Sequence, residues 1–233
     1  MPSPDESHSA IREALTGHYG RQGSPFAGMD LFEAFVSVIL DRAFEAKSRD
    51  TAVSALREDG LLEPQALAEA ELADFEEALR SAGLKIPKNA FGSLRRLARW
   101  LVDLHHGDLD ELYGESSPVL TAQLRDELLT VNGVGPSTAD SLLLFTLNRP
   151  VYPIDRATYR VLFRHGWIDQ DTDYDAARDV AERFAHDDPA LLTTLSMWME
   201  RLGSDFCRAR APKCDRCPLR PFLQENGPVF SDD

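Results

Sequence analysis

Apolar residues recur along most of the chain at intervals of three and four, which is the spacing of an amphipathic α-helix. Residues 31–46 are apolar on nearly all sides and predict a buried central helix. Residues 88–106 carry one clear apolar stripe, which predicts a long helix with a single buried face. No segment alternates clearly as a strand does, so we expect an all-α fold. The same spacing predicts further helices over residues 10–20, 49–58, 70–82, 108–113, 124–131, 137–146, 156–165, 175–186 and 189–203.

Three segments lack this spacing. Residues 1–9 predict a disordered tail, and residues 22–28, rich in glycine, serine and proline, predict a linker. Residues 169–175 read Asp-Gln-Asp-Thr-Asp-Tyr-Asp, and such alternating aspartates occur in calcium loops. This segment lacks the glycine and the glutamate that an EF-hand requires at its sixth and twelfth positions, so we interpret it as a solvated loop.

Length and composition limit the class of protein. With 233 residues, of which 43% are hydrophobic, the chain can bury the core of one large or two small domains. No run of 18 apolar residues is present and residues 1–20 are polar and charged, so we expect neither a membrane-spanning helix nor a secretory signal. All three cysteines fall within residues 207–217, which argues for a reduced, metal-type loop in a cytoplasmic protein and against a disulfide scaffold.

The most informative pattern is a tight turn between two predicted helices. Residues 132–136 (Asn-Gly-Val-Gly-Pro) end the first helix, and residues 137–140 (Ser-Thr-Ala-Asp) fit a capping box in which the serine caps the second. We expect the amides of Gly133, Val134 and Gly135 to lack intrahelical partners beside a helix N-terminus. Such a place favours an anion, for example a phosphate. The alternative is an ordinary helix–turn–helix corner that ends in glycine.

This hairpin resembles the helix-hairpin-helix of the endonuclease III superfamily of base-excision DNA glycosylases. In that family a short loop and a catalytic aspartate follow the hairpin, and a cysteine loop follows the last helix. The resemblance extends over roughly residues 31–217 and is more specific for the fold than for the substrate. The matching residues are Gly133, Val134, Gly135, Thr138 and Ala139, then Pro153-Ile154-Asp155, Arg160-Val161 and the block from Leu195 to Cys217.

The resemblance implies two helical domains. Residues 29–149 would form a six-helix barrel that ends in the helix-hairpin-helix, and residues 150–206 would form a second helical domain. Residues 1–28, a tail and a helix, would pack with that second domain. Residues 207–233 would form the cysteine loop and a C-terminal tail.

Asp155 occupies the place of the family's catalytic aspartate. Cleavage of a base from deoxyribose builds positive charge on the sugar, which a nearby carboxylate can stabilise while it helps to activate water. Asp155 also precedes the predicted helix 156–165, so a plain N-cap is the alternative reading, and the two roles are compatible.

Members of the family that also cleave the DNA strand carry a lysine where this chain has Ser137. A strand-cleaving lyase needs such an amine to form a Schiff base, and none of the four lysines lies near the motif. The resemblance therefore implies a monofunctional glycosylase that uses water, with an alkylated base as its substrate. The alternatives are a glycosylase for oxidised pyrimidines, a DNA-binding protein without activity and a helical scaffold that does not bind nucleic acid.

The implied partner is double-stranded DNA that contains a damaged base, bound by a monomer away from any membrane. The net charge of −14 opposes DNA binding, but basic residues are concentrated in residues 84–102, 156–167 and 201–220. Each segment could equally be a solvated helix face. Arg42 follows the first barrel helix, where the family often has a glutamine, and could wedge into the duplex or lie on the surface. The DNA-binding candidates are Gly133, Val134, Gly135, Ser137, Thr138 and Arg42.

The cysteines follow the pattern Cys207-x6-Cys214-x2-Cys217, which matches three ligands of the family's [4Fe–4S] cluster. The fourth cysteine is expected at the position of Leu223. Clusters usually take four thiolates, so a cluster here would need water, a carboxylate or an external thiol as its fourth ligand. Zinc would also need a fourth ligand, and a loop with three free thiols is the remaining alternative.

Overall fold

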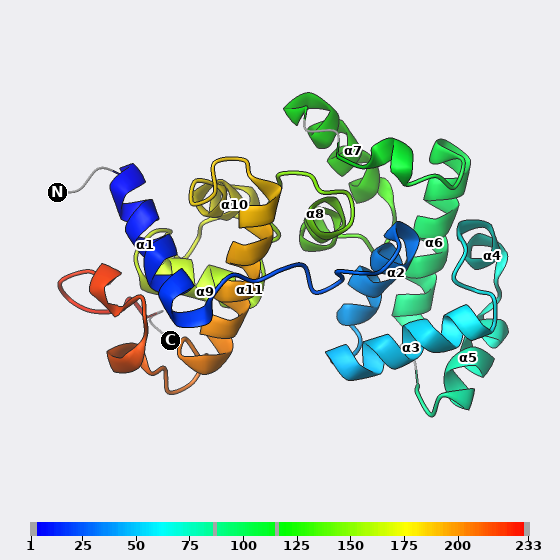
Figure 1. The fold of residues 1–233 in the computed structure, drawn as a ribbon, viewed down its shortest axis with the longest axis horizontal. Helices are drawn as coiled ribbons and strands as arrows, with labels where there is room; N and C mark the ends of the chain where they lie inside the picture. The colour runs from blue at the N-terminus through cyan, green and yellow to red at the C-terminus, as the bar shows by residue number, and fades with distance from the viewer. Residues whose placement is uncertain (1–3, 86–87, 115–116, 231–233) are drawn as a thin grey trace. The chain divides into compact units, whose positions relative to one another are not determined.

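The computed structural model describes residues 4–85, 88–114 and 117–230, and these are predominantly helical (Figure 1). Within these ranges the only β-type pairing is an isolated bridge between Gln224 and Gly227. The predicted all-α class is therefore confirmed. None of the helices described combines the length and the apolar character that crossing a bilayer requires.

The chain forms two compact units. Unit 1 comprises residues 1–25 and 150–233, and unit 2 comprises residues 26–149. The beginning of the chain thus belongs with its C-terminal third, and the middle of the chain packs as a unit of its own.

Helix α2 lies at the centre of unit 2 and packs on α3, α6 and α8. Its side chains Phe35, Val36 and Leu40 are at most 1% exposed, as expected for a central buried helix. Asp30 caps its N-terminus by accepting a hydrogen bond from the Glu33 amide (2.8 Å). The helices of unit 2 are α2 (Leu31–Asp41), α3 (Ala46–Glu58), α4 (Pro64–Glu69), α5 (Leu72–Ser81), α6 (Lys88–His105), η1 (Asp110–Leu112), α7 (Pro118–Thr130) and α8 (Pro136–Phe145).

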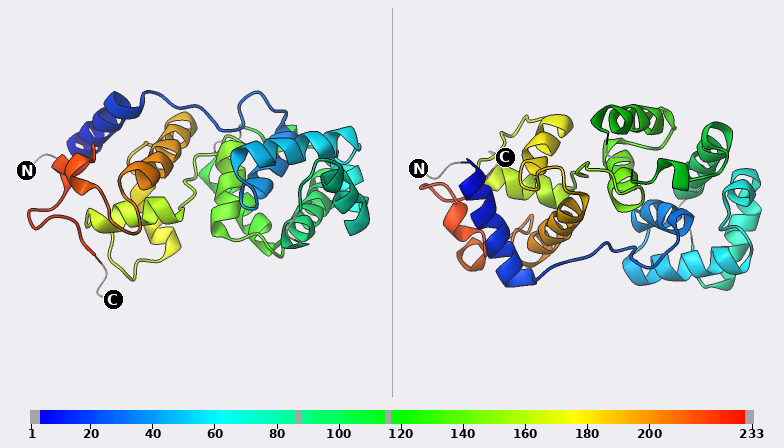
Figure 2. Two further views of the ribbon diagram at one scale, coloured as in Figure 1. Left: turned by 90° about the horizontal axis from the view of Figure 1, so that it is seen from below. Right: turned by 45° about the horizontal axis from the view of Figure 1, so that its top comes forward.

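Unit 1 is built on the crossing of α9 and α11, which both views of Figure 2 show. The two helices approach closely because Gly203 has no side chain, and a Cβ there would lie 2.5 Å from Cβ of Ala157. Helix α1 packs on α11, and Trp198 Nε1 donates to the Gly20 carbonyl (2.8 Å). The helices of unit 1 are α1 (Pro4–Tyr19), α9 (Arg156–Arg164), α10 (Tyr174–Glu182), α11 (Pro189–Asp205), η2 (Cys214–Arg216) and η3 (Arg220–Phe222).

Helix α2 ends at Asp41, five residues before its predicted end. The Phe44 amide donates to the Leu40 carbonyl as the chain turns, and α3 then begins at Ala46 instead of residue 49. An ion pair accompanies this turn, because the largely buried guanidinium of Arg49 contacts the half-exposed Asp41 carboxylate at 2.6 Å. Helical spacing alone does not reveal such a pair.

Two further expectations differ from the structure. Residues 4–9 of the predicted disordered tail belong to α1, whose His8 ring packs on Phe184 at a centroid distance of 4.5 Å; residues 1–3 lie outside the described residues. Helix α4 (Pro64–Glu69) is absent from the sequence prediction because six residues are too few to show a helical period.

Candidate functional site

The turn between α7 and α8 has the tight backbone that its glycines predict. Gly133 has φ +94°, a conformation that L side chains rarely adopt, whereas Gly135 is extended at φ −97°. The Val134 amide donates to the carbonyl of Val131, the residue after α7 (2.9 Å), so it has a partner within the turn although none within a helix. Among the described residues, the amides of Gly133, Gly135 and Ser137 donate no hydrogen bond.

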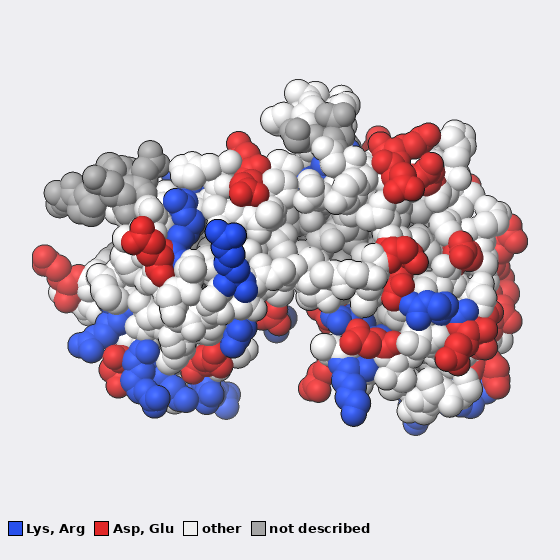
Figure 3. Space-filling model, viewed as in Figure 1, with Lys and Arg blue, Asp and Glu red and all other residues white. Residues whose placement is uncertain are grey.

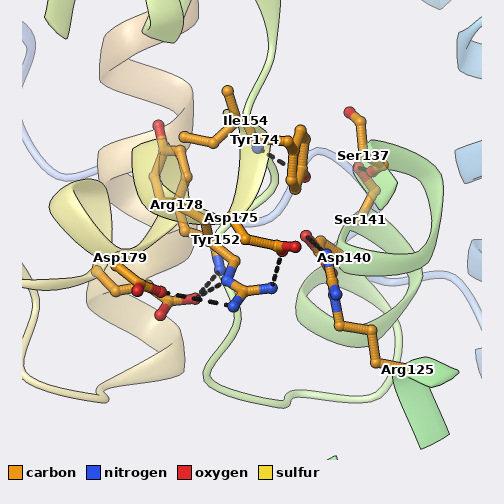
Figure 4. A network of polar contacts seen from close by, with 11 residues as sticks. Arg125, Ser137, Asp140, Ser141, Tyr152, Ile154, Tyr174, Asp175, Arg178 and Asp179 are labelled. Carbon is orange, nitrogen blue, oxygen red and sulfur yellow. Dashed lines mark hydrogen bonds and ion pairs between the residues drawn. The ribbon is translucent and has the colours of Figure 1, made fainter. Parts of the chain in front are cut away.

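The predicted capping box at Ser137 does not form. Helix α8 begins one residue earlier, because Pro136 occupies its first position, where a fixed φ and a missing N–H suit a helix start. Gly135 is the N-cap and provides no side-chain cap. Ser137 lies inside the first turn, where its carbonyl accepts a hydrogen bond from Ser141 Oγ (2.7 Å; Figure 4).

Asp140, the last residue of the predicted box, joins α8 to α7 instead. Its carboxylate is fully buried and accepts from Arg125 Nε at 2.6 Å (Figure 4). A buried carboxylate is stable only with partners of this kind, so the pair fixes the angle at which the two helices meet.

Helix α6 supports the turn from the side. Arg96 Nε donates to the Asn132 carbonyl (2.6 Å), and Ser93 lies so close that a Cβ on Gly133 would be 2.4 Å from Ser93 Oγ. The sequence analysis missed both contacts. In the sequence, Arg96 is one of several basic residues in 84–102 and has no feature that distinguishes it from the others. The side chain of Lys88, in the same segment, lies outside the described residues.

An open hollow of about 590 Å³ brings three of the predicted DNA-binding residues together within unit 2. Gly133 and Thr138 line it from the hairpin, and the exposed Arg42 lines it from the turn after α2. The side chains of Val134 and Thr138 are buried, so these two residues anchor the hairpin in the core of unit 2. The glycine backbone of the hairpin and Ser137 reach the surface. Its full lining is Ile39, Arg42, Ala43, Ala90, Ser93, Gly133 and Thr138.

Asp155 is the N-cap of α9, as predicted. Its Oδ1 accepts a hydrogen bond from the Thr158 amide (2.6 Å), and the residue is exposed. Three positions before it, Tyr152 is fully buried, with its hydroxyl 3.1 Å from Thr158 Oγ1. Burial, and secondarily the Asp155 charge, raises the pKa of Tyr152 far above its ordinary value, so its hydroxyl stays protonated.

Helix α10 fixes the segment that leads to Asp155. The Tyr152 amide donates to Glu182 Oε1 (2.9 Å), and the Ile154 amide donates to the Tyr174 hydroxyl (3.1 Å). Arg178 pairs with acidic residues on α10, among them Asp175 (2.9 Å; Figure 4). Because the backbone before Asp155 is held at two amides, the carboxylate is presented from a rigid support.

Two of the basic residues in 156–167 hold the cysteine loop. Arg160 Nε donates to the Cys207 carbonyl (2.6 Å). Arg164, which is buried, donates to the carbonyls of Arg208 (2.6 Å) and Ala209 (3.1 Å). Of the three arginines in this segment, only Arg156 remains as a candidate for a DNA-binding face.

The three cysteines line one small cavity in unit 1. Leu223, at the position expected for a fourth cysteine, lines the same cavity with a hydrocarbon side chain. Burial raises the pKa of Cys217 to about 11, so without a bound cation this group is a protonated thiol. In the described part of the chain, no three His, Cys, Asp or Glu side chains converge closely enough to bind a single metal ion.

The sequence analysis also missed His165 at this cavity. The residue ends α9, its ring is buried, and it lines the cavity together with the cysteines. Burial lowers the pKa of His165, so its ring is neutral. A histidine 42 positions before the first cysteine gives no local signal in the sequence.

Basic side chains gather on the lower edge of unit 1 in Figure 3, where Figure 1 places the end of α11 and the loop after it. Residues 201–220 contain six bases, five of which are exposed. The acidic chain therefore carries a local basic surface on this unit, as the charge distribution of the sequence predicts. Its exposed members are Arg201, Arg208, Arg210, Arg216 and Arg220.

Known proteins resemble the chain over nearly its whole length, although no model of a known protein family matches it. A Methanocaldococcus jannaschii protein provisionally named a DNA repair glycosylase is 29% identical over 91% of this chain and 93% of its own. Endonuclease III of Sulfolobus acidocaldarius is 29% identical over 84% and 82%. The solved structure of a trapped covalent intermediate between endonuclease III and DNA superposes with a TM-score of 0.72, at 21% identity and 97% coverage of both chains, which establishes the same fold.

Proposed function

The chain belongs to the endonuclease III superfamily of DNA glycosylases, and we propose that it hydrolyses the N-glycosidic bond of an alkylated base in double-stranded DNA. The observation that carries this proposal is the exposed carboxylate of Asp155, held on a rigid support at the N-terminus of α9. The match to the Methanocaldococcus jannaschii relative, which is named for DNA repair and glycosylase activity, supports the reaction class.

Asp155 acts on the sugar and on water. As the bond between the sugar and the base breaks, the electron pair of that bond leaves with the base, and positive charge develops on the sugar ring. The carboxylate stabilises that charge and accepts a proton from the water whose oxygen attacks the anomeric carbon. A base that carries positive charge leaves as a neutral molecule, the carboxylate passes its proton to the solvent, and the abasic sugar carries the new hydroxyl.

The hairpin binds the DNA backbone. The amides of Gly133, Gly135 and Ser137 donate no hydrogen bond within the part of the chain that the structure describes, and they lie at the positive end of α8. A phosphate oxygen can accept from such amides whatever the base sequence. Arg42 lines the same hollow, and in this proposal it contacts the duplex beside the hairpin.

The enzyme has no lyase activity in this proposal. Ser137 stands where the bifunctional relatives carry an amine, and it is a half-buried residue inside α8. Without a Schiff base the abasic product leaves with both strands intact. Water therefore serves as the nucleophile, and alkylated bases, whose bond to the sugar is already weakened by charge, are the substrate class that we propose.

A [4Fe–4S] cluster at the cysteine loop would be held by Cys207, Cys214 and Cys217 alone, because Leu223 stands at the position of the fourth ligand. All three line one cavity, and Arg164 Nη1 lies 3.5 Å from Cys207 Sγ, where it would stabilise a thiolate. When bound, the cluster supplies a cross-link that holds the basic loop 207–220 in place. Asp155 and the hairpin need no electron from it.

A set of duplexes that differ in one base tests the function. One contains an alkylated purine, one an oxidised pyrimidine and one no damage, and the free base is measured by mass spectrometry. We expect release from the alkylated duplex alone. Release from the oxidised pyrimidine would keep the glycosylase and replace the substrate class, whereas binding to all three without release would leave a DNA-binding protein that is not an enzyme.

A further inference from the structure

The segment that leads to Asp155 has no regular structure of its own. Residues 151–154 are buried, and their backbone groups make no backbone-to-backbone hydrogen bond within the described part of the chain. A buried amide needs a partner, because an unpaired one is unfavourable. Pro153 has no amide hydrogen, so Tyr152 and Ile154 are the two residues between position 151 and Asp155 whose amides need a partner.

Both partners come from helix α10, one from each end. The Tyr152 amide donates to Oε1 of Glu182, the last residue of the helix (2.9 Å). The Ile154 amide donates to the hydroxyl of Tyr174, the first residue of the helix (3.1 Å; Figure 4). The Glu182 carboxylate is itself held, because its Oε1 lies 3.5 Å from Nε of Arg178, one turn earlier on α10. The position of the segment therefore depends on two side chains of α10.

A continuous set of hydrogen bonds joins Glu182 to the Asp155 carboxylate. Tyr152, whose amide binds Glu182, places its hydroxyl 3.1 Å from Thr158 Oγ1. The Thr158 amide in turn donates to Asp155 Oδ1 (2.6 Å). The carboxylate is thus fixed from two directions, by the first turn of α9 and by the buried segment that α10 holds.

We propose that Glu182 and Tyr174 are positioning residues for base release. This inference rests on the proposed function, because it assigns both residues to the reaction of Asp155. The carboxylate has to lie close to the anomeric carbon and to the attacking water, and a displacement of about 1 Å can slow an enzymatic step about 100-fold. Without an acceptor at position 182, the segment would move until water reaches the Tyr152 amide, and Asp155 would move with it.

Substitution by glutamine separates the two properties of Glu182. The proposed role needs an acceptor oxygen and no charge, and the side-chain amide of glutamine keeps that oxygen. Glu182→Gln should therefore release base within about threefold of the natural rate, whereas Glu182→Leu should be slowed about 10- to 100-fold. Tyr174→Phe keeps the ring, removes the acceptor of the Ile154 amide and should be slowed about 10-fold.

The test compares the rate of base release with DNA affinity. Single-turnover release is measured with each protein in excess over a damaged duplex, and affinity is measured with an undamaged one. A positioning residue changes the rate and leaves the affinity, because the hairpin proposed to bind phosphate belongs to unit 2. A merely structural residue would lower the melting temperature without slowing the folded protein. Asp179→Leu is the control and should react at the natural rate, because Asp179 is exposed and contacts Arg178 at 3.5 Å.

Hydrogen exchange of the Tyr152 and Ile154 amides, followed by NMR, gives a readout that needs no activity. Both amides should exchange slowly in the natural protein, and the Tyr152 amide should exchange faster in Glu182→Leu. Rapid exchange of both in the natural protein would show that α10 does not hold the segment.

The outcomes separate this inference from the proposed function. Slow release by Glu182→Leu with near-natural release by Glu182→Gln supports the positioning role. Release by folded Glu182→Leu at the natural rate would overturn it, and so would equal slowing of the two variants, which would indicate a role for the charge. If Glu182→Leu does not fold, Tyr174→Phe decides by the same measurement. No release by the natural protein from any duplex would instead refute the proposed function, and this inference with it.

Discussion

The two glycines of the hairpin should respond differently to the same substitution. At Gly135 the backbone is extended, and a new Cβ would meet no atom within 4 Å. At Gly133 φ is +94°, and a Cβ would lie 2.4 Å from Ser93 Oγ and 3.0 Å from Arg96 Nη2. Valine at position 135 therefore tests whether the hairpin surface binds DNA, whereas valine at position 133 tests whether the turn can still fold.

The expected magnitudes follow from these contacts. Gly133→Val forces a side chain into a left-handed conformation and into α6, which should lower the free energy of unfolding by about 2 kcal/mol or more. Gly135→Val should change it by less than about 1 kcal/mol, because the loss of an N-cap glycine is offset by a less flexible unfolded chain. On DNA, Gly135→Val places a branched side chain over the free amides. The loss of one hydrogen bond to a charged phosphate, about 1.5–3 kcal/mol, weakens binding about 10- to 150-fold.

Urea unfolding and a binding titration with an undamaged duplex separate the two effects. The titration is repeated at several salt concentrations. The neutral amides release no counterion of their own, so Gly135→Val should lower the affinity and leave the salt slope unchanged. Loss of a basic contact such as Arg42 would instead reduce the slope by about 0.9. Unchanged affinity in a folded Gly135→Val protein would mean that the hairpin is only a corner between helices.

Two further predictions concern the hairpin and the reaction. Borohydride should trap no covalent adduct with abasic DNA, because Ser137 supplies no amine; a trapped complex would contradict the monofunctional assignment. Arg125→Ala removes the guanidinium from the fully buried Asp140 carboxylate and should cost about 3–5 kcal/mol in urea unfolding. Arg80→Ala, which breaks an exposed pair with Glu77, should cost less than about 1 kcal/mol, and equal losses in the two variants would refute this reading of Asp140.

Much of the fold could be predicted from the sequence, because helices leave a local signal. The stripe in residues 88–106 predicts α6 (Lys88–His105) nearly to the residue. The end of α2 could not be predicted in the same way, since it coincides with the pairing of Arg49 with Asp41 and not with a change in apolar spacing. The six residues of α4 are too short for a period, although they pack on α6.

The functional residues show the same difference between local features, which the sequence predicts, and contacts between distant residues, which it does not. The tight turn and the N-cap at Asp155 are local, so the motif locates them correctly. The capping box fails because Pro136 starts the helix one residue before Ser137. Arg96 contacts the hairpin and His165 lines the cavity of the cysteines, and each is far in the sequence from the residues that it joins. The spacing of residues in the sequence carries no information on such contacts, so both were missed.

The central claim is that the Asp155 carboxylate takes part in the reaction, and Asp155→Asn tests it most directly. Asparagine caps a helix as well as aspartate does, so the variant keeps the cap of α9 and loses only the charge. Asp173→Asn is the matched control, because Asp173 caps α10 in the same way by accepting from the Ala176 amide at 2.8 Å.

The quantity to measure is the single-turnover rate of base release from a damaged duplex, with melting temperature and DNA affinity recorded for each variant. We expect Asp155→Asn to slow release by a factor on the order of 10²–10³ or more, with stability and affinity nearly unchanged. Asp173→Asn should release the base at the natural rate. Release by folded Asp155→Asn at the rate of the Asp173→Asn control would show that Asp155 is a helix cap and nothing more.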